Sequence, residues 1–292
     1  MSQVTAADVK KLREMSGAGM MDCKRALNET GGGMDAAMDL LRKKGLSAAA
    51  KKAGRIAAEG VVVAAAEGNI GVVLEVNSET DFVSKNDQFS GFVNKLAAMI
   101  ISRNPADVAA LNALPFDGEF TVEQALSQLI ATIGENMSIR RFERAEVDAG
   151  AVATYVHGAG KIGVLVAFDK AVDDALARGV AMHVAATNPR FIGRSDVDAA
   201  SIERERAVLT DRAIASGKPE TIVAKIVTGQ LSKFYSDVCL LEQDFVLDTD
   251  KKVGAALGDA NVVSMARFQL GEGIEKKAED FAAEVAAQVQ GG

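Results

Sequence analysis

The sequence contains few residues that could make or break covalent bonds. His157 and His183 are its only histidines, and Cys23 and Cys239 are its only cysteines. None of the four lies in a nucleophile motif, a Cys-x-x-Cys pair or a Cys/His cluster with metal-ligand spacing. We therefore expect no enzymatic activity, no bound metal and no cofactor, and we interpret both cysteines as small buried apolar residues.

A glycine-rich segment is the one candidate for binding a nucleotide. Gly158-Ala-Gly-Lys-Ile-Gly163 matches the dinucleotide pattern GxGxxG. That pattern holds a pyrophosphate only when a strand precedes it and the N-terminus of a helix follows it. Here strand-like sequence lies on both sides, so we interpret the segment as a hairpin turn. A nucleotide-dependent enzyme remains the alternative, and binding of labelled NAD or GTP to the isolated chain would support it.

The composition is typical of a soluble globular protein. The chain has 292 residues, of which 48% are hydrophobic and 25% charged, and this length suggests about two domains. The longest charge-free run, from Ala149 to Gly160, is shorter than the roughly 18 to 20 apolar residues of a membrane span. The N-terminus lacks the pattern of a signal peptide. We expect a cytoplasmic protein that does not cross a membrane.

Charge is distributed unevenly along the chain. Residues 1–55 carry eleven Lys/Arg and six Asp/Glu, a net charge of +5. Since the whole chain has a net charge of −7, the remaining residues carry a net charge of −12. An acidic body with 12 Phe, 2 Tyr and no Trp offers little to neutralise phosphates or to stack on bases. These features favour a protein partner and no direct contact with nucleic acid.

The first fifty residues predict three short helices. They run from Thr5 to Ser16, from Met20 to Thr30, and from Met34 to Lys44 with Gly45 as the C-cap. The following residues 46–55 are rich in Ala and Lys and predict a tether. Met20 and Met21 follow a glycine at a helix start, where thioethers could form a binding face, although core packing is the alternative for one of them.

A repeat organises the middle of the chain. Residues 60–76 match residues 150–168, and each copy predicts a β-hairpin with a glycine in its turn. A helical stretch that ends in Asn-Pro follows each hairpin, with the Asn at 104 and 188. The offset between copies is 92 at Ile70 and Ile162 but 84 at the Asn-Pro pairs. The first copy therefore has eight extra residues, which we place between hairpin and helix at 78–87.

Those extra residues contain the segment Thr80-Asp81-Phe82-Val83. One interpretation makes Phe82 a buried staple in the first turn of the following helix. The other makes Phe82 an exposed anchor for a partner, a role in which aromatic residues are enriched. Because the second copy predicts the same hairpin and helix without this segment, the core does not require Phe82, and we favour the second interpretation.

Helices and strands also fill the remaining sequence. A helix is expected at 121–134, a strand at 136–147, and a returning strand at 262–270. A helical hairpin is expected from Asp198 to Ser216 and from Glu220 to Asp237. The first arm is very polar, with Ile202, Leu209 and Ile214 as its apolar seam, so we expect the hairpin to project as a coiled coil. A terminal amphipathic helix is expected from Ile274 to Val289.

Eight segments in colinear order carry a recognisable pattern. They are MSGAGMMDCKRAL (15–27), AAKKAGRIAAEGV (49–61), GVVLEVNSETDFVSKNDQF (71–89), ENMSIRRFE (135–143), HGAGKIGVLVAF (157–168), AMHVAATNPRFI (181–192), SGKPETIVAKIVTGQLSKFY (216–235) and RFQLGEGIEKKAEDFAAEVAAQ (267–288). These segments closely resemble bacterial translation elongation factor Ts. The similarity covers essentially the whole chain, and we interpret the 102–120 stretch, which departs most, as a surface connection.

The resemblance implies an α+β fold with a specific domain organisation. It suggests a ubiquitin-associated-like three-helix domain with a basic linker at 1–55, two related α+β core subdomains at 56–148 and 149–197, a coiled-coil hairpin at 198–237, a return to the core at 238–271 and a C-terminal helical module at 272–292.

The resemblance also implies a function. Members of the family are guanine-nucleotide exchange factors of elongation factor Tu, and they carry no cofactor. By analogy, Asp81 and Phe82 enter the GTPase near its Mg²⁺ site, while Thr80 and Val83 keep the tip in shape. Secondary contacts are expected at Met20, Met21, the turn from Ile133 to Asn136 (with Ile133 and Gly134), His157 and the terminal helix. A passive adaptor that binds through the N-terminal helices is the alternative, and dimerisation through the coiled coil stays open.

Overall fold

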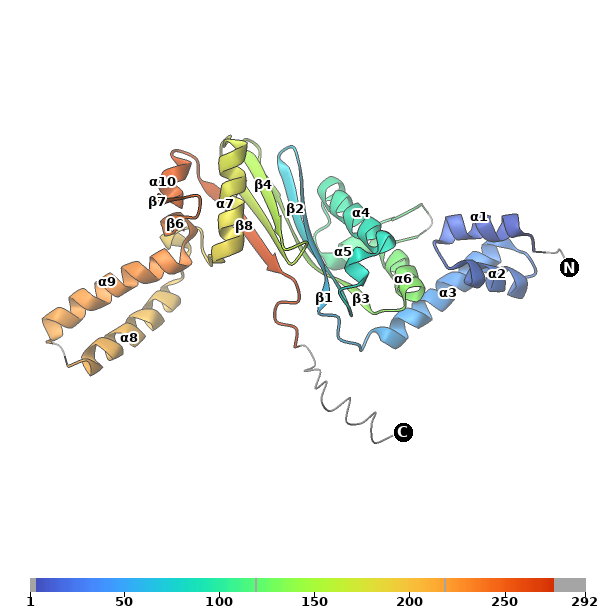
Figure 1. Cartoon of the computed structure of the whole chain (residues 1–292), viewed down its shortest axis with the longest axis horizontal. Helices are drawn as coiled ribbons and strands as arrows, with labels where there is room; N and C mark the ends of the chain where they lie inside the picture. Colours follow the sequence, from blue (N-terminus) through green and yellow to red (C-terminus); the bar gives the residue numbers. More distant parts are fainter. Residues whose placement is uncertain (1–3, 119, 218, 276–292) are drawn as a thin grey trace, which may run out of the picture.

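The chain forms an elongated arrangement of helices and sheets. A computed structural model describes residues 4–118, 120–217 and 219–275, so the expected terminal helix lies outside the described residues from 276 onward. Figure 1 shows helices α1–α3 at one end, two sheets in the middle and the hairpin α8–α9 at the other end. The fold is α+β, as expected. Within the described residues, no helix combines the length and the apolar character needed to cross a membrane.

The first sheet is antiparallel with strand order β1-β2-β3. It consists of β1 (Glu59–Glu67), β2 (Ile70–Ser78) and β3 (Met137–Glu146). Its outer face packs against α4 (Asp87–Arg103) and α6 (Val122–Ile133), with α5 (Val108–Ala113) beside them. Apolar side chains at helical spacing on α4, including Phe89, Leu96 and Ile100, are fully buried in this core.

The second sheet repeats this plan with strand order β4-β5-β8. It consists of β4 (Ala151–His157), β5 (Ile162–Phe168) and β8 (Val262–Gln269), and α7 (Asp174–Thr187) covers its outer face. In Figure 1, α4 and α7 lie on opposite outer sides of the two sheets. Between α7 and β8 the chain forms α8 (Ala199–Ala215), α9 (Glu220–Val238), β6 (Asp244–Phe245), β7 (Asp248–Lys252) and α10 (Val253–Leu257).

The predicted repeat is confirmed at the level of the hairpins and of the helix ends. β1 pairs with β2, and β4 pairs with β5, each in antiparallel register. Gly60 and Gly150 both have positive φ, and a Cβ at these positions would approach the carbonyl oxygen of the partner strand to 2.2 and 2.1 Å, so both positions require glycine. Both α4 and α7 end at an asparagine in the left-handed region, Asn104 and Asn188.

The inner faces of the two sheets pack against each other. Val62, Val73, Leu165 and Phe268 form the small core between them. The glycines of the GxGxxG pattern serve this contact. Gly163 lies in β5, and a Cβ on it would approach Val62 to 2.5 Å, while a Cβ on Gly160 would approach Val61 to 2.3 Å. The segment is thus a hairpin turn, as expected, whose glycines permit close approach of the sheets.

Helix α3 differs from the prediction. It runs from Met34 to Lys52, so Gly45 is not a C-cap and the expected tether at 46–55 is mostly helical. Gly45 lies where α3 crosses α6, and a Cβ on it would come within 2.7 Å of Gln128 Nε2. The glycine therefore marks close helix packing. The preceding helices, α1 (Ala6–Ser16) and α2 (Met20–Glu29), agree with the prediction.

Two further expectations need correction. The 102–120 stretch is more than a surface connection, because it includes α5 and buries Leu111 and Phe120 in two different cores. In the hairpin, Leu209 lies in the seam but Ile214 is 59% exposed, and Ala213 takes its place. A small residue suffices there because the facing helix supplies Val223, Val227 and Leu231.

The eight extra residues of the first copy are not all in one loop. Seven residues separate Ser78 from the helix N-cap Asn86, whereas two separate Lys170 from the corresponding N-cap Asp173. The remaining difference lies in the helices, because α4 has 17 residues and α7 has 14. The longer connection and the longer helix together account for the eight extra residues.

Candidate partner-binding site

The connection between β2 and α4 presents an exposed aromatic side chain. We call residues 79–85 the tip. Phe82 is 74% exposed, whereas its neighbour Val83 is 3% exposed and packs into the core of the first sheet. The interpretation of Phe82 as a buried staple is therefore wrong. A large apolar side chain held in water by its backbone is a feature of binding surfaces more than of cores.

A carboxylate from a distant turn holds the tip. Glu135 lies in the turn between α6 and β3, and it accepts two hydrogen bonds from Thr80. The backbone N–H of Thr80 donates to Glu135 Oε2 at 2.9 Å, and its hydroxyl donates to Oε1 at 2.7 Å. Charge-assisted, bidentate contacts of this kind restrict geometry more strongly than single neutral hydrogen bonds.

A second carboxylate also joins the tip to the turn between α6 and β3. Glu79 accepts a hydrogen bond from the backbone N–H of Asn136, and Arg55 lies 3.4 Å from the Glu79 carboxylate. The side-chain amide of Asn136 in turn donates to the carbonyl of Arg55 at 2.7 Å. The tip, the turn after α6 and the segment after α3 are thus tied together by side chains from all three.

Local hydrogen bonds shape the tip itself. The hydroxyl of Ser84 donates to the carbonyl of Asp81 at 2.6 Å, and the hydroxyl of Ser78 donates to the carbonyl of Thr80 at 2.9 Å. Asn86 caps α4 by accepting from the backbone N–H of Gln88 at 2.9 Å. These bonds fix the backbone on both sides of Phe82 and leave its ring free.

An open groove of about 1180 Å³ lies beside the tip. Asp81 and Phe82 of the tip line it together with Arg55, Ile56 and Lys161. Lys161 forms an ion pair with Glu59 at 2.8 Å. The groove therefore brings together the tip, the start of the first sheet and the hairpin turn of the second copy.

The other predicted contact residues occupy three separate places. Met20 and Met21 are 57% and 63% exposed at the start of α2, so the core alternative is wrong for both. Gly134 is the exposed C-cap of α6, and Ile133 is half-buried. Their turn adjoins the tip because Glu135 bonds to Thr80. His157 is exposed at the end of β4, with the Tyr155 hydroxyl 3.1 Å from its Nδ1.

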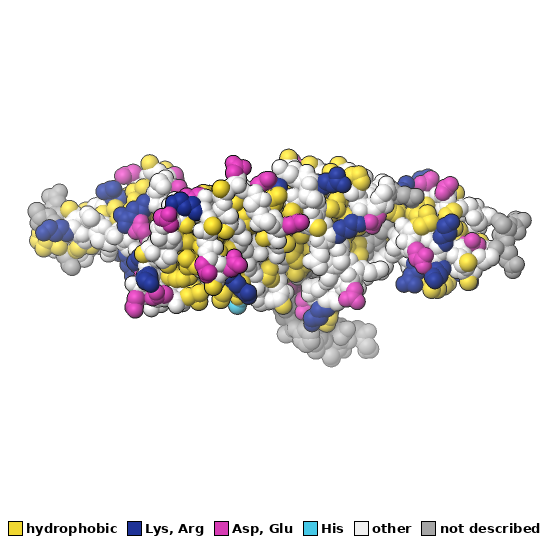
Figure 2. All heavy atoms as spheres, turned by 90° about the horizontal axis from the view of Figure 1, so that it is seen from above, with side chains coloured by type: hydrophobic (Ala, Val, Ile, Leu, Met, Phe, Trp, Pro, Cys, Tyr) yellow, Lys and Arg dark blue, Asp and Glu magenta, His cyan; other side chains and the backbone are white. Residues whose placement is uncertain are grey.

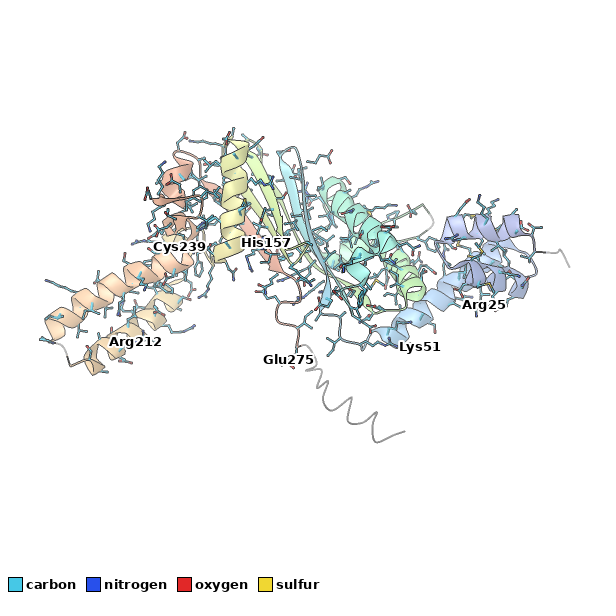
Figure 3. The ribbon with its side chains drawn as sticks, in the orientation of Figure 1. Arg25, Lys51, His157, Arg212, Cys239 and Glu275 are labelled. Carbon is cyan, nitrogen blue, oxygen red and sulfur yellow. The ribbon has the colours of Figure 1, made fainter. Side chains whose placement is uncertain are left out.

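The structure joins only some of these residues. Thr80 and the turn after α6 meet through Glu135, but His157 lies in the middle of the molecule and Arg25 of α2 lies at its N-terminal end (Figure 3). Sequence reasoning missed Glu79, whose only signal is that it precedes Thr80. It included Glu135 in the expected contact turn from Ile133 to Asn136 but missed that Glu135 holds the tip.

Charged side chains of both signs are interspersed along the face seen in Figure 2. Among the described residues, no group of three or more His, Cys, Asp and Glu could hold a metal ion.

Cys23 and Cys239 are both buried, as expected, and burial raises the pKa of each thiol.

Comparison with known proteins decides the family. The family described as Elongation factor TS matches residues 79–272, a range that begins at the tip. The chain belongs to the elongation factor Ts family. The elongation factor Ts of Magnetococcus marinus is 52% identical over 301 residues, covering 99% of each chain. Those of Paramagnetospirillum magneticum and Syntrophotalea carbinolica are 53% and 50% identical, cover 99% of this chain, and are themselves covered to 98% and 100%.

Membership of this family makes the chain a translation elongation factor, and the resemblance stated from the sequence is confirmed. Because the relatives align over nearly the whole chain, the similarity extends to the N-terminal helices as well as to the tip.

Proposed function

We propose that this chain is a guanine-nucleotide exchange factor that acts on elongation factor Tu in the cytoplasm. It binds the GDP-bound GTPase through the tip, promotes release of GDP and yields to GTP. The chain makes and breaks no covalent bond in this process. The observation that carries the proposal is the exposed Phe82 on a tip that Glu135 holds in one conformation.

The exposure of Phe82 supports its role as an anchor. An aromatic side chain that inserts into a partner pocket gains the burial it lacks in the free protein, and such anchors dominate interface energetics. A tip that is already ordered loses little conformational entropy on binding. The two hydrogen bonds from Thr80 to Glu135 therefore contribute to affinity without touching the partner.

Exchange requires only differential binding. GDP is held in the GTPase by backbone amides and by Mg²⁺, so a factor that prefers a conformation with this site distorted will lower the affinity for GDP. The coupling is reciprocal, since GDP must lower the affinity for the factor by the same ratio. In our proposal Asp81 and Phe82 supply the distortion next to the Mg²⁺ site.

Contacts elsewhere would add affinity. Met20, Met21 and His157 are exposed on other parts of the molecule, and several weak contacts on one frame bind more strongly together than apart. The two methionines are also the observation that favours the second candidate, a passive adaptor that binds through its N-terminal helices.

Release of a fluorescent GDP analogue from elongation factor Tu tests the proposal. Addition of this chain is expected to accelerate release, and excess unlabelled GDP prevents rebinding. A passive adaptor would bind the GTPase without changing the release rate. A nucleotide-dependent enzyme would itself bind labelled GTP or NAD in the absence of the GTPase. Either result without acceleration would refute the proposal.

Chelation of Mg²⁺ tests the mechanism within the proposal. If the tip acts on the Mg²⁺ site, then EDTA should raise the rate of GDP release without the factor, and the further acceleration by the factor should be smaller than in millimolar Mg²⁺. Two perturbations of one site are not additive. If the ratio of GDP-release rates with and without the factor were undiminished in EDTA, the tip would act on the phosphate or base side of the nucleotide instead of on the Mg²⁺ site.

A further inference from the structure

The N-terminal helices meet the rest of the molecule at a junction where α3 packs against α6. We call residues 4–52 the N-terminal module and residues 53–275 the body. Gln128 of α6 lies against Gly45 of α3, and its side-chain amide donates to the carbonyl of Leu41 at 2.9 Å. In Figure 3, Lys51 lies where α3 approaches the body, while Arg25 lies at the far end of the module.

A body residue fills part of the module's core. Phe120 belongs to the connection between α5 and α6, which extends from the body toward the N-terminal helices (Figure 1). Its side chain is 6% exposed and lies in the same cluster as Val9, Leu12 and Leu27 of the module. The guanidinium of Arg42 lies 4.7 Å from the centre of the ring, a cation–π distance.

Backbone hydrogen bonds join the two ends of the connection that carries Phe120. The backbone N–H of Phe116 donates to the carbonyl of Phe120 at 2.7 Å, and that of Val122 donates to the carbonyl of Leu114 at 3.0 Å. Phe116, on the same connection, packs toward the body, with its ring 5.2 Å from that of Phe92. Two aromatic residues of one short segment thus contact the two sides of the junction.

The junction is not tightly packed beside these contacts. A cavity of about 350 Å³ lies between module and body, lined by Met15 and Gly17 on the module side and by Phe92, Lys95 and Leu129 on the body side. Helix α3 alone links the parts covalently. Besides the packing of α3 on α6, the orientation of the module depends on Phe120, whose side chain reaches from the body into the module's core.

We propose that Phe120 is a positioning residue that docks the N-terminal module on the body. It holds Met20 and Met21 at a fixed distance and orientation from Asp81 and Phe82, so that the GTPase meets one preformed surface with two contact points. This inference rests on the proposed exchange function. Two linked contacts reinforce each other only when the link allows both to engage at once, and a fixed link avoids the entropy of ordering the module.

Phe120→Ala and Phe116→Ala form a matched pair for the test. GDP release from the GTPase is measured against factor concentration. For Phe120→Ala, the concentration that gives half-maximal acceleration should rise about tenfold or more. The plateau rate should stay unchanged, because the tip is intact. Phe116→Ala, which faces the body, should leave the half-maximal concentration within about twofold, and Phe120→Leu should restore most of the wild-type value. A fall in the plateau rate alone would overturn the inference.

A second variant separates docking from folding of the module. Gln128→Ala removes a docking hydrogen bond without changing the cluster that contains Phe120. It should shift the half-maximal concentration in the same direction as Phe120→Ala. If Phe120 served only to keep the module folded, Gln128→Ala would have no effect, and hydrogen exchange in α1 and α2 would rise in Phe120→Ala alone.

The shift in half-maximal concentration caused by Phe120→Ala should also disappear when Met20 and Met21 are already removed. In a Met20→Ala/Met21→Ala background, Phe120→Ala should cause no further change, because it acts through those side chains. Small-angle scattering of the free chain reports module orientation independently of exchange. If the wild-type chain failed to accelerate GDP release, the proposed function would fail, while an unchanged scattering profile of Phe120→Ala would reject docking itself.

Discussion

The two β-hairpin and helix copies share a frame and differ in what joins strand to helix. In the second copy, two residues lead from Lys170 to the cap Asp173, and they complete the fold without an exposed aromatic residue. In the first copy, the corresponding connection projects Phe82 into solvent and is held from outside by Glu135. The comparison shows that the frame tolerates a long connection at this point, so selection can act on the connection without disturbing the core.

The copies also differ in how they satisfy a buried polar side chain. Glu75 of β2 is fully buried as a carboxylate, with Arg140 and Arg141 at 2.9 and 2.7 Å and the Gly271 N–H at 2.8 Å. His183 of α7 is fully buried without a nearby charge, bonded to Gln243 at 2.9 Å and to the Val246 N–H at 3.2 Å. One network is ionic and the other is neutral, so they respond to pH differently.

Substitution of the exposed aromatic residue of the tip gives the largest expected effect on exchange. Phe82→Ala should slow factor-promoted GDP release about 30-fold or more, because loss of a central aromatic anchor costs about 2 kcal/mol of binding. Its free energy of unfolding should change by less than about 0.5 kcal/mol, since the side chain is exposed. An unchanged release rate would remove Phe82 from the mechanism.

Val83→Ala is the matched control for this prediction. Val83 is buried in the core of the first sheet, so its truncation should lower the free energy of unfolding by about 1 to 2 kcal/mol. At a temperature where the variant remains folded, exchange should be reduced less than in Phe82→Ala. A drop in melting temperature for Phe82→Ala instead would argue that its ring packs on the protein.

Loosening the tip from outside should give the next largest effect. Glu135→Ala removes the acceptor of both Thr80 hydrogen bonds, and each charge-assisted bond contributes about 1.5 kcal/mol. We expect factor-promoted GDP release to fall about tenfold, and we expect Glu135→Gln, which keeps one acceptor oxygen, to lie between Glu135→Ala and wild type. Equal rates for all three would show that the tip needs no support from this turn.

The sequence was sufficient to predict much of the frame. Alternation of apolar residues and the paired glycines indicated both hairpins, and the repeat indicated that Phe82 lies outside the shared core. Asn104 and Asn188 marked the ends of α4 and α7 correctly because Asn readily adopts the left-handed conformation and Pro then prevents continuation of the helix. These signals are local, which is why the sequence alone reveals them.

The errors arose where a distant segment decides the role of a residue. Gly45 resembles a C-cap, but Gln128, 83 positions later, makes it a site of close helix packing. Phe120 lies in a polar connection, and only the fold brings it into the core of the N-terminal module. Glu79 and Glu135 carry no motif of their own. Glu79 bonds to Asn136 and Glu135 bonds to Thr80, so both contacts join segments that are 57 and 55 residues apart.

Removal of the hairpin should have a smaller effect than either change at the tip. The hairpin is the long insertion of the second copy. Its buried apolar residues pack against one another within α8 and α9, namely Leu209, Val223, Val227 and Leu231. A chain that lacks Asp198 to Tyr235, joined by a short Gly/Ser linker, should keep acceleration of GDP release within about tenfold of wild type, since the tip is untouched. Complete loss of acceleration in a folded deletion variant would make the hairpin part of the working interface.

The smallest expected effect distinguishes the two buried networks by pH. Burial lowers the pKa of His183 below 6.5, although its hydrogen bond to Gln243 opposes this shift. Above pH 6.5 the folded and unfolded chains both hold a neutral imidazole. Below it only the unfolded chain takes up the proton, so the free energy of unfolding should fall by up to about 1.4 kcal/mol per pH unit until the folded pKa is reached. The protection factors of α7 amides between pH 8 and 5, normalised to the intrinsic exchange rate at each pH, measure this loss, and His183→Gln should abolish the change in protection.

The ionic network should respond in a separate, more acidic range. Burial alone would raise the pKa of Glu75, but the Gly271 N–H and the guanidiniums of Arg141 and Arg140 together lower it below 4.5. Its contribution to stability is therefore complete above pH 4.5 and is lost as the pH falls through the folded pKa. The protection factors of β2 amides should stay unchanged at pH 5, where those of α7 amides have begun to fall. If both elements lost protection together, the two copies would unfold as one unit, and the contrast between their networks would have no consequence for stability.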